Sequence, residues 1–405
     1  MLVMNQPTLL KIRLRPTHLL LLITAALALS TSCRKENRHD NNNDLANFGQ
    51  VILVANKASY NPVLVDSTLQ NAWGLTFSSN GIAWVNSQAG GVSELYTGEG
   101  ARVRAGVHIP SPTDSVGGQP TGVVFSANKG FRLPNNQGSN FLFAGTDGVL
   151  SGWNGAAGNN AFRLKNNSAT SVYTGLTLAA NGSANFIYAA NFKTGRIDVW
   201  DTTFTLVHMS FRDPGMPMGY APFNIQAIGS WLFVAYAKVG PDGDEVHAPG
   251  AGFVSIFNTD GSFVKRFASG GTLNAPWGVV QAPAGWVTDS TLDRHNDRIF
   301  DDHGNGGGDN SGHGNNNGDD DKGHVDNDQP TILVGNFGDG RINVFSLDGK
   351  FLGQLRSHDH TIVIDGLWAL SFAPSTATTI DPNRLYFTAG PADETDGVFG
   401  YLIRQ

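Results

Sequence analysis

Two stretches of the chain, NFKTGRIDVW at residues 191–200 and NFGDGRINVF at residues 336–345, are nearly the same sequence. Each combines a short polar turn that ends in glycine with a strand in which apolar and polar residues alternate. Looser copies of this strand pattern occur elsewhere as GVSELY, GVLSGWN, GFVSIFN and GVFGYL. Agreement of this kind indicates a repeat architecture, in which each unit buries its faces against its neighbours.

A second pattern opens each of the six repeat units. It reads NAWGL, QPTGV, VYTGL, APFNI, APWGV and GLWAL, at intervals of about 50 residues except for a longer last one. Alignment gives one column of large or hydroxyl residues, namely Trp73, Thr121, Thr174, Phe223, Trp277 and Trp368. The next column is mostly glycine, which we attribute to crowding of the innermost strands near an axis. We expect the tryptophans to be core residues, with ligand stacking as the alternative.

Between these patterns lie the apolar second strands IAWVNS, FLFAGT, FIYAAN, LFVAYA, ILVGNF and LYFTAG. Four short strands in each unit, separated by glycine and polar turns, are typical of a β-propeller blade. The sequence therefore predicts an all-β fold, a six-bladed β-propeller of four-stranded antiparallel blades over residues 46–405. The early segment FGQVILVAN is expected to complete the last blade beside GVFGYL, which closes the ring without a free edge.

Composition supports this fold class and excludes several others. The 405 residues include 50 glycines, 40% hydrophobic residues and only 15% charged residues, which is too apolar for a chain disordered throughout. A net charge of -7 gives no basic footprint for nucleic acid. The one cysteine excludes an intramolecular disulfide. We expect a monomer.

The amino terminus has the pattern of an export signal. Three basic residues precede the apolar run from Leu19 to Leu29, and three small residues then lead to Cys33. This resembles the lipobox of bacterial lipoproteins, although Ser30 stands where that family favours leucine. The sequence predicts a signal peptide at 1–32, lipidation of Cys33 with membrane attachment, and a polar tether at 33–45. An ordinary secretion signal with an incidental cysteine is the alternative.

A low-complexity insertion interrupts the fifth unit between its first and second strands. Residues 290–328 are rich in Asp, Asn, Gly and His and have almost no apolar residues, so we expect a disordered acidic surface loop. The alternative is a metal-binding loop that uses Asp and Asn oxygens or His295, His303, His313 and His324.

No local signature of catalysis is present: the chain has no GxSxG, HExxH, P-loop or paired-cysteine motif. We therefore assign no catalytic residue. By position in the repeat, five polar residues are the candidates for ligand binding at the channel mouth, namely Asn71, Gln119, Asn224, Asn274 and Asp365. One carboxylate among several asparagines suits calcium, which is the candidate cofactor, but no glutamate occupies an equivalent position.

The repeats with N-F-x-x-G-x-I-x-V-[FW] and P-x-G-V resemble those of NHL and related six-bladed propellers. The whole mature chain, through NAWGL, QPTGV, ANFKTGRIDVWD, NAPWGV and GNFGDGRINVF, is similar to a family of exported bacterial conserved hypothetical proteins. The resemblance implies fold and export. It supplies no catalytic residues.

Two functions from different classes remain open. The first, which we favour, is a lipid-anchored, non-enzymatic scaffold at the bacterial cell envelope, facing the periplasm or the exterior. It would bind a protein, peptide or glycan through loops such as residues 212–222 and 238–252. The second is a metal-dependent hydrolase of the lactonase or phosphotriesterase-like kind, with a cation in the central channel. Asp365 is the residue on which that alternative depends.

Overall fold

The computed structural model describes residues 45–127, 129–287 and 330–405. Four predicted features lie outside the described residues: the signal peptide, Cys33, the tether up to residue 44, and the insertion at 290–328 with its four histidines.

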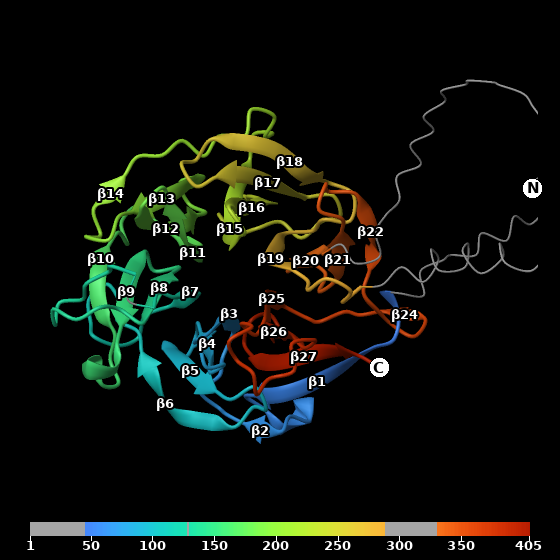
Figure 1. Ribbon diagram of the computed structural model, residues 1–405, viewed down its shortest axis with the longest axis horizontal. Helices are drawn as coiled ribbons and strands as arrows, with labels where there is room; N and C mark the ends of the chain where they lie inside the picture. The colour runs from blue at the N-terminus through green and yellow to red at the C-terminus, as the bar shows by residue number, and fades with distance from the viewer. Residues whose placement is uncertain (1–44, 128, 288–329) are drawn as a thin grey trace, which may run out of the picture. The chain divides into compact units, whose positions relative to one another are not determined.

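Six antiparallel sheets stand around a common axis as the blades of a propeller, which confirms the predicted fold (Figure 1). The first strand of each blade lies nearest the axis and the fourth at the rim. In blades one to three the strands are β3 (Ala72–Phe77), β4 (Ala83–Ser87), β5 (Val92–Tyr96) and β6 (Arg102–His108); β7 (Pro120–Phe125), β8 (Phe141–Gly145), β9 (Val149–Trp153) and β10 (Phe162–Asn166); β11 (Tyr173–Asn181), β12 (Ala184–Asn191), β13 (Arg196–Trp200) and β14 (Leu206–Val207).

Blades four to six complete the ring. Their strands are β15 (Tyr220–Ile228), β16 (Trp231–Lys238), β17 (Gly252–Asn258) and β18 (Phe263–Ser269); β19 (Pro276–Gln281), β20 (Ile332–Asn336), β21 (Ile342–Phe345) and β22 (Phe351–Gln354); β25 (Leu367–Phe372), β26 (Leu385–Ala389), β27 (Val398–Arg404) and β1 (Phe48–Ala55). Smaller elements are β2 (Leu64–Val65), the hairpin β23 (Arg356–Ser357) with β24 (His360–Thr361), and the 3-10 turns η2 (Ala58–Tyr60) and η3 (Gly155–Ala157).

The ring closes as the sequence predicted. Strand β1 pairs antiparallel with β27, so the first strand of the described chain is the outer strand of the last blade. The short strand β2 then pairs parallel with β1 and extends this sheet to five strands. Strands β19 and β20 pair with each other although residues 282–331 separate them, which confirms the place of the insertion in blade five.

The repeated turn of the two quoted stretches has a backbone reason for its glycine. Gly195 and Gly340 have φ angles of 67° and 68°, in the left-handed region that other residues enter at a cost. The turn joins the second and third strands of its blade, so the recurring N-F-x-x-G sequence marks a fixed backbone shape.

The hydrophobic core is divided among the joints between blades. Among the described residues, six clusters of buried side chains each combine strands from two adjacent blades. Tyr188 and Val199 of blade three, for example, pack with Ile225 and Leu232 of blade four. This is the neighbour-on-neighbour burial that a repeat fold requires.

A seventh cluster lies on the axis itself. In every blade the pairing of the first strand with the second shifts register at the motif column, and this shift forms a β-bulge. Bulges change the direction in which side chains point. Side chains from blades one, three, four, five and six meet there, which we call the axial aromatic cluster: Trp73, Phe192, Phe223, Trp277, Phe337 and Trp368. The prediction that the tryptophans are core residues is confirmed, and they pack at the axis.

Candidate functional site

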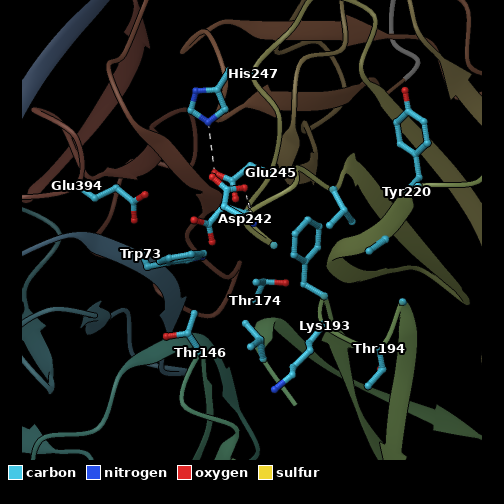
Figure 2. A pocket seen from close by; sticks show the side chains of 18 of the residues that line it. Trp73, Thr146, Thr174, Lys193, Thr194, Tyr220, Asp242, Glu245, His247 and Glu394 are labelled. Carbon is cyan, nitrogen blue, oxygen red and sulfur yellow. Dashed lines mark hydrogen bonds and ion pairs between the residues drawn. The ribbon is translucent and has the colours of Figure 1, made fainter. Parts of the chain in front are cut away.

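A large cavity opens at one end of the axis, above the axial aromatic cluster. This mouth pocket has a volume of about 920 Å³. Its lining comes from the turns of five blades: Trp73 and Gln88; Thr146; Val172, Thr174 and residues 192–195; residues 219–221, Val239, residues 242–245 and His247; and Glu394. Figure 2 shows how these side chains surround one space.

Blade four contributes more of the wall than any other blade. The lining segments 219–221 and 239–247 belong to the two loops that the sequence singled out as binding loops. They are held together by a hydrogen bond from the Val239 N–H to the Gly219 carbonyl, 2.8 Å. Within the second loop, Val246 donates to the carbonyl of Lys238, also at 2.8 Å. The wall is therefore fixed by backbone contacts before any ligand arrives.

The polar wall is strongly acidic. Four carboxylates line the pocket, from Asp242, Asp244, Glu245 and Glu394, against the single ammonium group of Lys193. In Figure 2, Glu394, Glu245 and Asp242 lie on one side of the pocket, and Lys193 lies on the opposite side from His247. Such a separation of charge gives the pocket a negative end.

Neighbouring charges and burial shift the pKa values of the side chains at the negative end of the pocket. His247 Nε2 lies 3.3 Å from Glu245 Oε1, and this hydrogen bond raises the pKa of His247. Burial raises the pKa of Glu394, and the nearby Glu245 and Asp244 raise it further, while a hydrogen bond from Asn71 opposes them. Burial also raises the pKa of Asp244, with Glu245 and Asp242 acting in the same direction.

An unusual backbone turn presents Glu394. Ala392, Asp393 and Glu394 have φ angles of 57°, 53° and 62°, three successive left-handed residues with no glycine among them. Each costs roughly 1 kcal/mol or more, and such strain persists only where surrounding contacts hold it. Asp365 Oδ2 accepts a hydrogen bond from the Ala392 N–H at 3.1 Å, and Asn71 Nδ2 donates to Glu394 Oε2 at 2.6 Å.

We expect the variant Ala392→Gly to be more stable than the natural protein by about 0.5 to 1 kcal/mol, because glycine removes the left-handed strain. Urea unfolding followed by circular dichroism measures the change. The matched control is Ala156→Gly in the exposed turn η3, which should lose stability. Equal losses in both variants would contradict the left-handed turn.

The five predicted mouth residues do not share one cavity. Asn71 is 1% exposed and touches the mouth pocket through Glu394, while exposed Gln119 touches it through Thr146, whose hydroxyl donates to Gln119 Oε1 at 2.9 Å. Asn224 is buried and donates to the Trp277 carbonyl at 2.8 Å.

The remaining two candidates lie elsewhere. Buried Asn274 sits beside Gly338, and its Oδ1 has no hydrogen-bond partner among the described residues. Asp365 is exposed and lines a smaller cavity of about 300 Å³ next to the mouth, which also contacts His247 and Glu394. Ligand binding by the five residues stays a prediction, but Asn71 and Asp365 both position Glu394.

Glu394 is the functional candidate that the sequence reasoning missed. Glu394 reaches the mouth from the loop between β26 and β27, so it lies outside the columns of the repeat, in which no glutamate stands. That loop stands where blades one, two, three and five carry a short turn with glycine, but it is longer and reads GPADETDG. A search for departures from the repeat, rather than for matches to it, would have found this residue.

Metal binding stays an open prediction. In residues 45–127, 129–287 and 330–405, no group of three or more His, Cys, Asp or Glu side chains is arranged to hold one metal ion.

No helix within the described ranges has the length and apolar character of a membrane span.

Comparison with known proteins gives viral relatives. No model of a known protein family matches the chain. The chain is 30% identical over 357 residues to "Uncharacterized protein L690" of Acanthamoeba polyphaga mimivirus, which covers 84% of this chain and 82% of that protein. It is 28% identical over 358 residues to "Uncharacterized protein R648" of the same virus, which covers 84% of this chain and 76% of that protein.

Both of these relatives belong to a giant virus, and a bacterial source for this chain stays a prediction. Among solved structures, the fold is similar to "Streptogramin B lyase structure", with 13% sequence identity, a TM-score of 0.46, and coverage of 88% of this chain and 97% of that one.

Proposed function

This chain belongs to the family of the mimivirus protein L690, and we propose that it is a non-enzymatic binding protein whose ligand occupies the mouth pocket. The observation that carries the proposal is the pocket itself. Its volume of about 920 Å³ falls within the range of small-ligand sites, and it has an apolar floor with polar groups around the rim.

The axial aromatic cluster supports binding from one face. Trp368 is fully buried and stacks between Trp73 and Phe337, with ring centroids 3.5 Å and 3.8 Å apart. Because these rings fill the axis below the pocket, a ligand enters and leaves by the mouth alone. The cavity suits a ligand the size of a disaccharide or a short peptide, which agrees with the peptide or glycan that the sequence favoured.

Hydrogen bonds around the rim favour a preformed site. Gln88 accepts from Asn71 Nδ2 at 3.2 Å and donates to the Thr146 hydroxyl at 3.3 Å, which in turn donates to Gln119. This chain of contacts joins the mouth residues of blades one and two to the side chain that holds Glu394. A rim that is already ordered loses little entropy on binding.

The proposal extends to location. A signal peptide at 1–32 and a lipidated Cys33 would tether the propeller to a membrane surface, where the pocket could receive a ligand from outside the cell. The second function, a metal-dependent lactonase or phosphotriesterase-like hydrolase, would need a channel cation such as calcium.

We expect Thr194→Trp to block the pocket. Thr194 is an exposed lining residue on the turn between β12 and β13, so a large side chain there enters the cavity with little effect on stability, within roughly 0.5 kcal/mol. Thermal shifts would be measured with a panel of monosaccharides, disaccharides, amino acids and short peptides. A saturable shift in the natural protein should be absent in Thr194→Trp.

The matched control is Thr113→Trp, the same change at an exposed residue outside the pocket, which should keep the shift. A ligand that binds Thr194→Trp as tightly as the natural protein would place the site elsewhere. Binding that calcium restores after EDTA, with the ligand recovered hydrolysed, would favour the hydrolase instead.

A further inference from the structure

We propose that the mouth pocket selects a small organic cation, namely a primary ammonium group next to a hydroxyl or carbonyl oxygen. This inference rests on the proposed function, because it names the chemical class of the ligand that the pocket binds. An amino sugar and a lysine-containing peptide both carry this chemistry. Three features support it: the negative charge of the lining, the missing cationic partner of Glu394, and a buried donor without a partner beneath the pocket floor.

The charge comes first. Four carboxylates line the mouth pocket against one lysine, and the Lys193 ammonium already donates to the Ala169 carbonyl at 3.3 Å. Glu245 is half-buried and Glu394 is half-buried, so both are partly removed from water. Carboxylates in such a partly dry cavity attract a cation more strongly than the same groups in bulk solvent.

The half-buried Glu394 also lacks the cationic partner that buried carboxylates have elsewhere in the ring, whereas Asp242 and Asp244 are exposed to water. The buried carboxylates of Asp66, Asp213 and Asp396 each form an ion pair inside the protein, with Arg102, Arg266 and Lys57 respectively. Among the residues that the structure describes, no lysine or arginine forms an ion pair with Glu394, Asp242 or Asp244. A ligand cation can supply the charge that the fold leaves out.

An independent feature of the floor points to an oxygen on the ligand. Trp73 lines the pocket and is only 5% exposed, yet its indole Nε1 has no hydrogen-bond partner among the described residues. A buried donor without a partner costs roughly 1 to 3 kcal/mol. The other two tryptophans of the cluster do have partners: Trp277 donates to the Thr174 carbonyl and Trp368 to Asn71 Oδ1. The Nε1 atom of Trp73 is itself buried beneath the floor, so a ligand oxygen can accept this hydrogen bond only when the floor side chains shift.

The arrangement of the groups sets the orientation of the ligand. In Figure 2, Trp73 lies edge-on below Glu394 and Asp242, with Thr146 below it. An ammonium group between the carboxylates brings its neighbouring oxygen toward the indole. Thr146 and Thr174 then supply hydroxyl groups for the remainder of the ligand. Charge-assisted hydrogen bonds from the ammonium are the strong contacts in this arrangement.

The test uses two pairs of ligands in which acetylation removes only the charge. They are glucosamine with N-acetylglucosamine, and glycyl-lysine with glycyl-(Nε-acetyl)lysine. Binding to the protein is measured by isothermal titration calorimetry at neutral pH. We expect at least one amine to bind, and its acetylated partner to bind about tenfold or more weakly. The pair that shows this difference identifies the source as a sugar or a peptide.

The variant Glu394→Gln keeps the shape of the side chain and the contact with Asn71 but removes the charge. We expect it to weaken binding of the amine about tenfold and to leave binding of the acetylated form unchanged. The matched control is Asp359→Asn, at an exposed residue in the turn between β23 and β24 that does not line the pocket. It should leave both affinities unchanged.

Acidification should weaken binding of the amine, as the Glu394→Gln substitution does. Because burial raises the pKa of Glu394, its carboxylate takes up a proton at a higher pH than an ordinary glutamate. The groups that face Glu394 are Glu245, Asp244, His247 and Asn71. Because the pKa of His247 is raised, this side chain becomes cationic at a higher pH than an ordinary histidine. Affinity for the amine should therefore fall as the pH falls, and the Glu394→Gln variant should show a smaller fall.

The outcomes separate this inference from the proposed function. Equal binding of amine and acetylated ligand, or full affinity in Glu394→Gln, would overturn the inference. So would the absence of binding by both amines at millimolar concentration. If a ligand of the panel is nevertheless excluded by Thr194→Trp, the pocket is a binding site for another class, and the proposed function stands. If no ligand depends on residue 194, both fail.

Discussion

Replacement of Trp368 by alanine is expected to lower the free energy of unfolding by about 4 kcal/mol, because large aromatic side chains in a core cost this much when truncated. Trp368 is 0% exposed and contacts Trp73 and Phe337 in stacked geometry. Its indole also donates to Asn71 Oδ1 at 2.9 Å. The alanine variant leaves a cavity on the axis and an unpaired buried amide oxygen, and both effects destabilise the fold.

Urea unfolding followed by tryptophan fluorescence and circular dichroism measures this loss. Trp231→Ala is the matched control, since this tryptophan is 46% exposed at the start of β16, and it should cost less than about 1 kcal/mol. Trp368→Phe keeps a stacked ring without the N–H and should lose an intermediate amount. If Trp368→Ala is no less stable than Trp231→Ala, the axial aromatic cluster does not hold the blades together.

The variant Gly74→Ala is expected to cost about 3 kcal/mol, the upper part of the range for an overpacked core. A Cβ atom at this position would lie 2.0 Å from the backbone carbonyl oxygen of Thr121 in the next blade. That carbonyl also accepts a hydrogen bond from Asn86 Nδ2 at 3.0 Å. Because backbone cannot move aside as a flexible side chain can, blades one and two must separate to make room.

Gly155→Ala provides the control for this prediction. Gly155 is exposed in η3, and a Cβ atom there meets nothing within 4 Å. Stability should therefore be unchanged or slightly higher, since alanine restricts the unfolded chain. The melting temperatures of both variants are compared with that of the natural protein by calorimetry. A loss of similar size at both positions would argue against close approach of the innermost strands as the reason for the glycine column.

The repeats made the fold predictable in some detail. Each quoted pattern became a strand at the same place in its blade, and FGQVILVAN became β1 beside β27. Local periodicity carries this information, because a half-buried strand repeats every two residues and each blade repeats the same turns. The glycine column also had the predicted cause, as the contact between Gly74 and Thr121 shows.

The pocket was less predictable because it is made by departures from the repeat. Two of its loops, at 212–222 and 238–252, were named as candidate binding loops, but the residues chosen by column, such as Asn224 and Asn274, are buried in structural positions. Glu394 lies in a loop that the alignment of columns ignored. Positions shared by all blades mostly serve the packing that all blades share. The column residues Trp73 and Thr174 do line the pocket, but its four carboxylates come from residues outside the columns.

The sequence alone therefore determined the number of blades, the order of the strands and the way the ring closes, since these follow from local patterns and from burial between neighbours. Only the tertiary structure decided which side chains meet at the axis. Three residues of the pocket come from three different blades, namely Trp73, Glu245 and Glu394. Their spacing along the chain does not indicate that they lie close together. The strained turn at residues 392–394 is likewise held by Asp365 and Asn71, which lie far from it in the sequence. The position of the Glu394 carboxylate therefore depends on closure of the ring.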